Sequence, residues 1–273
     1  MLKMLINCLV LVCSLNACAS DPIFGTLDKS QRKHNENQRQ TLLIMMDLDE
    51  LYPDSHVRAL AKAAGKGDIL KVRQLVASGV NVNAQGRSKA TPLYWAIRKN
   101  NLAGFEALLK LGATPNVRFD DSGTMMHWAT RHQDSRFLQL ALSYGGDPNL
   151  RGGMYDSPAI WETVKSENTN IPNNYYQLIA AGTDLEIKDN IGTTLLGHAA
   201  ALGRYDVVLD LLNRGANFQM VNRMGMVLLF HCLDRDEKVL DNKSSVYQQK
   251  KKVEQWLRDR NIDYSKVKPE QIK

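Results

Sequence analysis

The sequence predicts an all-α solenoid of about six helix-turn-helix units joined by hairpin loops, and two repeated patterns carry this prediction. The first is a series of glycines that recur about every 33 residues, each preceded by apolar residues: Gly79, Gly112, Gly145, Gly182 and Gly215. The second starts twelve positions after each glycine, and its copies read TPLYWA, TMMHWA, SPAIWE, TLLGHA and VLLFHC. A period of about 33 residues is typical of proteins that stack copies of one small unit.

The composition agrees with a folded repeat domain. The 273 residues are 44% apolar and 23% charged, which excludes disordered, collagen-like and coiled-coil chains. The formal net charge of +6 comes from 35 basic and 29 acidic side chains, an excess that is small for a nucleic-acid-binding domain. We therefore expect no nucleic acid among the partners.

Recurring positions explain how each unit packs. Small side chains recur where two helices approach closely, at Ala63, Ala96, Ala129 and Ala199. Larger apolar side chains recur beside them and should fill the interior, at Leu60, Leu93, Met126, Leu196 and Leu229. Each repeated glycine should end a second helix, because the left-handed conformation found there costs glycine least.

Two units depart from the pattern. The unit that begins at Ser157 places Glu162 at the recurring alanine position and carries an insertion around 168–174, so we expect it to be the weakest unit and a candidate hinge. The last unit is longer than the others and ends at Asn261. Its second helix, about Val246 to Arg260, is rich in Lys and Gln and should close the stack with a polar face.

These motifs resemble the ankyrin repeat, whose mark is T-P-L-H-x-A at a period of about 33 residues. The stretch DNIGTTLLGHAA, from Asp189 to Ala200, is similar to that family's hairpin and first helix. The resemblance implies an ankyrin-repeat domain with a C-terminal cap over residues 55–273. Residues 39–54 are apolar at helical spacing and predict an N-terminal capping helix.

The N-terminal segment before that helix predicts export and an anchor. Residues 1–17 combine Lys3 with an apolar stretch too short to cross a bilayer, as a signal peptide does. The quartet Leu15-Asn16-Ala17-Cys18 resembles a bacterial lipobox, which implies a lipoprotein signal peptide over 1–17 and a lipid on Cys18 that binds the membrane. Residues 18–38 are polar and predict a tether. The alternative is an ordinary signal peptide without lipid.

The lipobox resemblance also implies a location. Because Ala19 rather than Asp follows Cys18, we expect an outer membrane lipoprotein that faces the periplasm of a Gram-negative bacterium. A minor cytosolic form that starts at Met45 or Met46 is a second alternative, although it would lose part of the capping helix.

The sequence offers no motif for catalysis, a cofactor or a metal. It contains no H-E-x-x-H, C-x-x-C, G-x-S-x-G, phosphate loop or G-x-G-x-x-G. His127 falls at the histidine of T-P-L-H, where the resemblance implies that the ring bonds backbone and orders the turn. His231 and Cys232 are adjacent and so point in different directions on a helix. We therefore expect a protein that is not an enzyme and needs no cofactor.

The hairpin tips and the ends of the first helices line the concave face in the resembled family, and they imply the partner-binding site. In this chain those positions combine basic, aromatic and apolar side chains, a mixture typical of interfaces. The candidate contact residues are Arg87, Arg98, Lys99, Arg118, Phe119, Arg131, Arg151, Met154, Tyr155, Lys188, Ile191, Arg223 and Met224. The excess of basic groups favours a protein partner with an acidic contact surface.

Lipobox and repeats together resemble ankyrin-repeat lipoprotein immunity proteins that act against type VI secretion phospholipase effectors. The resemblance implies a periplasm-facing protein that binds and neutralises such a lipase. The alternative is an ankyrin scaffold lipoprotein that organises or protects another envelope protein.

Overall fold

The computed structural model describes residues 43–153, 155–165 and 170–264. The predicted signal peptide, Cys18 and the tether lie outside the described residues, and so does the beginning of the predicted capping helix. No helix among the described residues combines the length and the apolar character that a membrane crossing requires.

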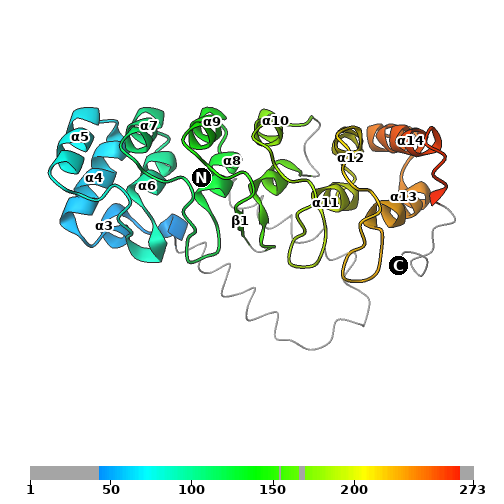
Figure 1. Cartoon of the computed structure of the whole chain (residues 1–273), viewed down its shortest axis with the longest axis horizontal. Helices are drawn as coiled ribbons and strands as arrows, with labels where there is room; N and C mark the ends of the chain where they lie inside the picture. Colours follow the sequence, from blue (N-terminus) through cyan, green and yellow to red (C-terminus); the bar gives the residue numbers. More distant parts are fainter. Residues whose placement is uncertain (1–42, 154, 166–169, 265–273) are drawn as a thin grey trace. The chain divides into compact units, whose positions relative to one another are not determined.

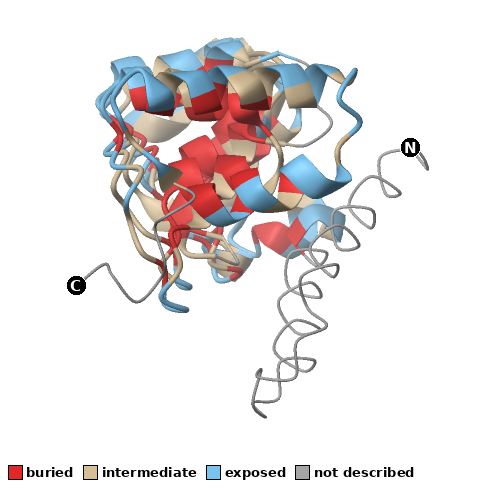
Figure 2. Ribbon diagram, turned by 90° about the vertical axis from the view of Figure 1, so that its right-hand side faces the viewer, coloured by how far each residue is buried: buried red, intermediate tan, exposed pale blue. Residues whose placement is uncertain are grey.

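The described residues form six pairs of short helices that follow one another along the chain (Figure 1). The pairs are α4 (Ser55–Lys66) with α5 (Ile69–Ala77), α6 (Pro92–Arg98) with α7 (Leu102–Lys110), α8 (Met125–Arg131) with α9 (Arg136–Ser143), η3 (Ala159–Thr163) with α10 (Asn173–Ala180), α11 (Leu195–Ala201) with α12 (Tyr205–Asn213), and α13 (Leu228–Val239) with α14 (Ser245–Arg258). First helices form one row and second helices another, and buried residues concentrate between the rows (Figure 2). This confirms the predicted all-α solenoid of six units.

Hairpin loops connect the pairs and project from one side of the rows (Figure 1). One of them carries a 3-10 turn, η2 (Arg87–Lys89). Another contains two short antiparallel strands, β1 (Arg151–Gly152) and β2 (Ser157–Pro158), paired as Arg151 with Pro158 and Gly152 with Ser157. The loops therefore present a row of neighbouring tips.

The recurring positions have the predicted roles. The alanines at the close approach are 0–6% exposed, and the larger apolar residues beside them are 0–3% exposed. The five repeated glycines follow the second helices with φ between 84° and 97°, and Asn261 takes φ 58° at the end of the last unit. A Cβ at any of the five glycines would meet no atom within 4 Å, so backbone conformation rather than crowding favours glycine there.

A row of amide side chains joins consecutive repeats. The Asn83 side chain donates to the Gly112 carbonyl at 2.9 Å and accepts from the Thr114 N–H at 2.8 Å. Asn116 and Asn149 make the same two bonds to the repeats that follow them. At the next repeat Glu186 accepts from the Asn217 N–H at 2.7 Å but, as a carboxylate, has no N–H to donate.

The segment before α4 differs from the single capping helix that the sequence predicts. Residues 43–45 are helical, and a second short helix, α3 (Leu48–Leu51), begins after a break at which Asp47 caps it. Leu43, Leu51 and Tyr52 are fully buried. The Tyr52 hydroxyl donates to the Thr91 carbonyl at 2.7 Å, so the segment packs along the first two units rather than on the first alone.

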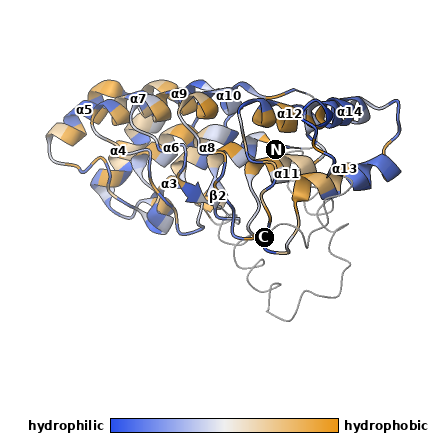
Figure 3. Cartoon of the chain, turned by 45° about the vertical axis from the view of Figure 1, so that its right-hand side comes forward, coloured by the Kyte–Doolittle hydropathy of each residue, from blue (hydrophilic) through white to orange (hydrophobic). Residues whose placement is uncertain are grey.

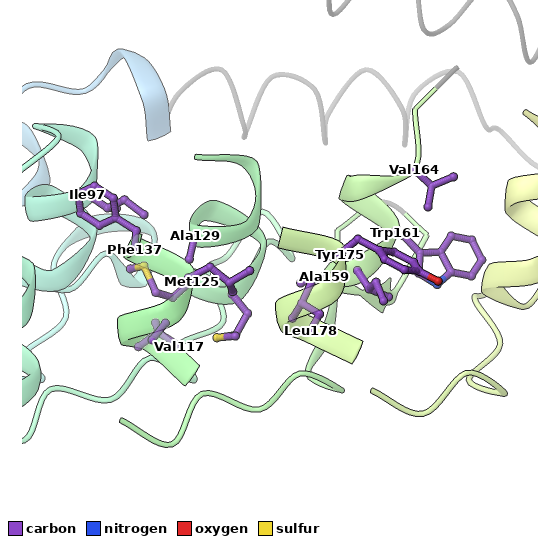
Figure 4. Close-up of a cluster of buried hydrophobic side chains, with 14 of the residues drawn as sticks. Ile97, Val117, Met125, Ala129, Phe137, Ala159, Trp161, Val164, Tyr175 and Leu178 are labelled. Atoms are coloured by element: carbon purple, nitrogen blue, oxygen red, sulfur yellow. The ribbon is translucent and has the colours of Figure 1, made fainter. Parts of the chain in front are cut away.

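The unit that begins at Ser157 is the irregular one, as its sequence predicts. Its first helix is the 3-10 helix η3, which lacks a side-chain cap. The core nevertheless continues through the unit, because Ala159, Trp161, Val164, Tyr175 and Leu178 are all buried (Figure 4). The Trp161 ring stacks on His198 of the next unit at 4.6 Å between centroids.

The C-terminal unit closes the stack with a largely polar helix, α14 (Figure 3). One of its lysines is an exception to the predicted outer face. Lys250 is fully buried and pairs with Glu237 and Glu254. The cap is therefore held partly by an ion network in which Lys250 and Glu254 are buried and Glu237 is half-exposed.

Candidate functional site

The same backbone turn shapes the described hairpin tips, except the one in which β1 and β2 pair. The Phe119 N–H donates to the Gly123 carbonyl at 2.8 Å, and Asp189 donates to Thr193 in the same way at 2.9 Å. Single backbone bonds also join neighbouring tips, as from the Asn190 N–H to the Tyr155 carbonyl at 2.9 Å. The tips thus form a connected row that fixes the spacing of their side chains.

Two predicted contact arginines share one carboxylate on this row. Arg118 Nη2 lies 2.6 Å from Asp156 Oδ1, and Arg151 Nε lies 3.1 Å from Asp156 Oδ2. All three side chains are 41–51% exposed, so solvent screens both pairs. The pairs position the arginines and leave a net charge of +1 on the three groups.

Three basic side chains line one cleft farther along the row. Arg223 is exposed, while Lys188 is half-buried and donates to the Val221 carbonyl at 3.4 Å. With Arg151 they line a cleft of about 460 Å³ between the hairpins. Asp189 also lines it, and burial raises the pKa of that carboxyl although three backbone amides of its turn lower it.

The basic residues of the first helices lie over aromatic rings. Arg98 and Lys99 approach the Trp95 ring centroid at 4.9 and 4.7 Å. Arg131 lies 5.8 Å from the Trp128 centroid, and its Nε lies 3.4 Å from Glu162. These distances are typical of cation–π contacts, which hold the charged groups against the helices.

Arg98 also binds the N-terminal segment. Its Nη1 donates to the Met46 carbonyl, and the Tyr94 hydroxyl donates to the Leu43 carbonyl at 3.3 Å. Gly86 lies so close to the Leu51 carbonyl that a Cβ would approach its oxygen to 2.1 Å. The segment therefore occupies part of the face at the first two units, and Arg98 is engaged there within the chain.

The predicted apolar contact residues differ in how far they are exposed. Ile191 and Met224 are 54% and 59% exposed on neighbouring tips, and Tyr155 is half-buried. Phe119 is 2% exposed and packs edge-on against Tyr94 at 5.4 Å, so the expectation that its ring offers an outer contact is wrong. Met154 lies outside the described residues. Arg87 is exposed at the first tip.

His127 serves the fold. The Thr124 hydroxyl lies 2.7 Å from His127 Nδ1, and His127 Nε2 lies 3.1 Å from the Ser157 carbonyl of the next unit. Because a carbonyl only accepts, Nε2 carries the proton and Nδ1 accepts from Thr124. Burial lowers the pKa of His127 to about 4, which keeps the ring neutral at pH 7. This confirms the predicted turn-ordering role.

Metal binding finds no support in the described part of the chain. Within it no three His, Cys, Asp or Glu side chains gather closely enough to hold a metal ion. His231 is exposed while Cys232 is buried, so the adjacent pair faces two different environments.

Sequence reasoning missed three features of this site. It did not find that Asp156 bridges two arginines, that the N-terminal segment covers part of the face, or that Arg151, Lys188 and Arg223 share a cleft. The regular spacing of the tips could have indicated the cleft. The bridge and the covering segment depend on contacts that the spacing does not encode.

Comparison with known proteins agrees with this architecture. A family model of ankyrin repeats, in three copies, matches residues 33–119. No curated protein matches the chain. Among matching solved structures is the ankyrin repeat domain of Bcl-3, described as a unique member of the IkappaB protein family, with 24% identity, a TM-score of 0.57, and coverage of 65% of this chain and 80% of that one. The likeness is one of fold, and the described residues form an ankyrin-repeat solenoid.

Proposed function

We propose that this ankyrin-repeat solenoid is a non-catalytic binding protein that recognises the acidic surface of another protein. The observation that carries the proposal is the row of basic side chains on the connected tips, with Ile191 and Met224 exposed among them. Basic groups of this kind accelerate encounter with an acidic partner, while exposed apolar groups supply contact energy once it has docked.

The partner that we propose is a secreted phospholipase effector of a type VI system, which the chain would neutralise as an immunity protein. The support is the resemblance of residues 15–18 to a lipobox together with the repeats. A lipid on Cys18 would hold the binding domain at the outer membrane, on the periplasmic side, where a phospholipase finds its substrate. Two or three acyl chains would make that attachment firm.

The test is a pull-down of residues 19–273, the chain without its signal peptide and Cys18, against the product of the neighbouring gene. A phospholipase assay with and without residues 19–273 follows. We expect a tight complex that silences the lipase. Binding without inhibition would overturn the immunity role and favour an envelope scaffold. Failure to bind would overturn this choice of partner.

A matched pair of variants tests whether the tips make the contact. Ile191→Asp puts a carboxylate on an exposed tip, and the affinity should fall about 100-fold, which is about 3 kcal/mol. Leu70→Asp makes the same kind of change at a residue that is 73% exposed on α5, in the row of second helices. It should leave the affinity unchanged. Equal affinities for the two variants would place the interface elsewhere.

A further inference from the structure

The cleft between the last three hairpins has a composition of its own. It measures about 460 Å³ and is lined by Arg151 from β1, by Lys188, Asp189 and Gly192 from the next tip, and by Arg223 from the tip after that. A Cβ at Gly192 would lie 3.0 Å from Arg223 Cγ, so the absence of a side chain there lets the arginine stem lie against the neighbouring turn.

The three cations keep donors available. The bonds from Arg151 to Asp156 both come from Nε, which leaves its two terminal nitrogens. Lys188 makes one long bond, of 3.4 Å, and an ammonium has three donors. Arg223 is exposed, and its guanidinium forms no ion pair with any other described residue.

The lining carries little opposing charge. Asp189 is the one carboxylate among the lining residues, and it is 6% exposed. Its Oδ1 already accepts from the Ile191 N–H at 3.0 Å and the Thr193 N–H at 2.7 Å. The Asp189 carboxylate is therefore bound largely by its own turn, and three basic side chains outnumber it among the lining residues, although Asp156 also pairs with Arg151.

We propose that this cleft binds the phosphate group of a phosphate ester. A phosphate offers oxygens in several directions and can meet three cations from three hairpins, whereas a planar carboxylate is satisfied by one arginine fork. The cleft is larger than a phosphate ion, and Ile191 and Met224 are exposed on the two tips that carry Lys188 and Arg223. The ligand is thus a phosphate with a small organic group, free in solution or as a lipid headgroup.

The cleft shares Arg151, Lys188 and Arg223 with the row that we propose contacts a protein partner, but binding of a small phosphate ester can be measured without that partner. Calorimetric titration of the full chain in a nonionic detergent with glycerol 3-phosphate and with inorganic phosphate tests it directly. A second arm adds phosphatidylglycerol or phosphatidylcholine to the detergent micelles and measures how tightly the chain associates with each lipid. Binding of the soluble ester points to a free ligand, and binding confined to phosphatidylglycerol points to a headgroup.

The double variant Lys188→Ala with Arg223→Ala should lower the affinity at least tenfold for whichever probe binds. Lys71→Ala with Arg73→Ala is the matched control, because it removes one lysine and one arginine from exposed positions on α5. The control should bind like the unaltered chain. No binding of any phosphate probe, or an equal loss in both double variants, would overturn the proposal.

Discussion

The first helix α8 and its counterpart η3 occupy equivalent places in neighbouring units, yet only α8 is a regular helix. In α8 the recurring alanine, Ala129, is fully buried, and Thr124 caps the helix. In η3 that position holds Glu162, whose side chain is 28% exposed, and no side chain caps the helix. A single large polar residue at the close approach is thus compatible with the stack when its helix is shortened.

The comparison shows what each unit needs in order to stay in register. The η3 unit keeps its apolar anchors, Trp161 and Ile160, and gains the short β1–β2 pairing before them. Its Glu162 reaches back to Arg131 of α8. The stack therefore continues through a unit whose first helix is short and of the 3-10 type, and in this unit the interior side chains stay buried.

Placing at each of these two positions the residue found at the other should have the largest effect on the free energy of unfolding. Ala129→Glu would place a charge where the native side chain is fully buried, and we expect a loss of about 4 kcal/mol in the free energy of unfolding. Glu162→Ala removes a partly exposed ion pair and should change the free energy of unfolding by less than about 1 kcal/mol. Urea unfolding at pH 7 measures both, and equal losses would show that the two positions do not differ.

Acid should weaken both sides of the η3 unit through the buried His127 and the half-buried His198. Burial lowers the pKa values of His127 and His198 to about 4. The unfolded chain binds protons below pH 6.5 while these folded rings stay neutral to about pH 4, so stability falls as the pH drops through this window. From pH 7 to pH 5 the loss should be about 2 kcal/mol for His127 and less for the partly exposed His198.

His127→Gln separates this effect from general acid sensitivity. The variant should lose about 2 kcal/mol less than the unaltered chain between pH 7 and pH 5. His231→Gln changes an exposed histidine and should follow the unaltered chain. An unchanged pH profile in the first variant would contradict the assignment.

Periodicity predicted the helix pairs, the glycines that end them and the alanine positions, because each of these features meets the same backbone or packing requirement in every unit. It could not place Phe119, whose burial against Tyr94 is a contact between units at a position where the other tips are polar or lack a side chain. It also could not place the segment before α4, because that path depends on bonds between distant parts of the chain, such as the one from Tyr94 to Leu43. Of the candidate site, the exposed tips were predicted and their pairing was not.

The row of side chains that joins consecutive repeats ends in three amides and one carboxylate, so it allows a comparison of single atoms between the two halves of the stack. Asn149 donates to the Gly182 carbonyl, whereas Glu186 Oε2 is buried and has no hydrogen-bond partner among the described residues. Glu186→Gln keeps the shape, preserves the bond from the Asn217 N–H and replaces that oxygen with an N–H donor. We expect the free energy of unfolding, measured in urea, to rise by about 1 kcal/mol.

Asn116→Asp makes the reverse change in the first half and is its matched test. It replaces the donor that bonds the Gly145 carbonyl at 2.9 Å with a carboxylate oxygen, and about 1–2 kcal/mol should be lost. Opposite signs in urea unfolding would show that each side-chain amide joins two units through both of its groups. At Glu186 the equivalent acceptor is the carbonyl of the next repeated glycine, Gly215. If Glu186→Gln left the free energy of unfolding unchanged, the new amide would not reach that carbonyl, and the last units would depend on α13 and α14 for their cohesion.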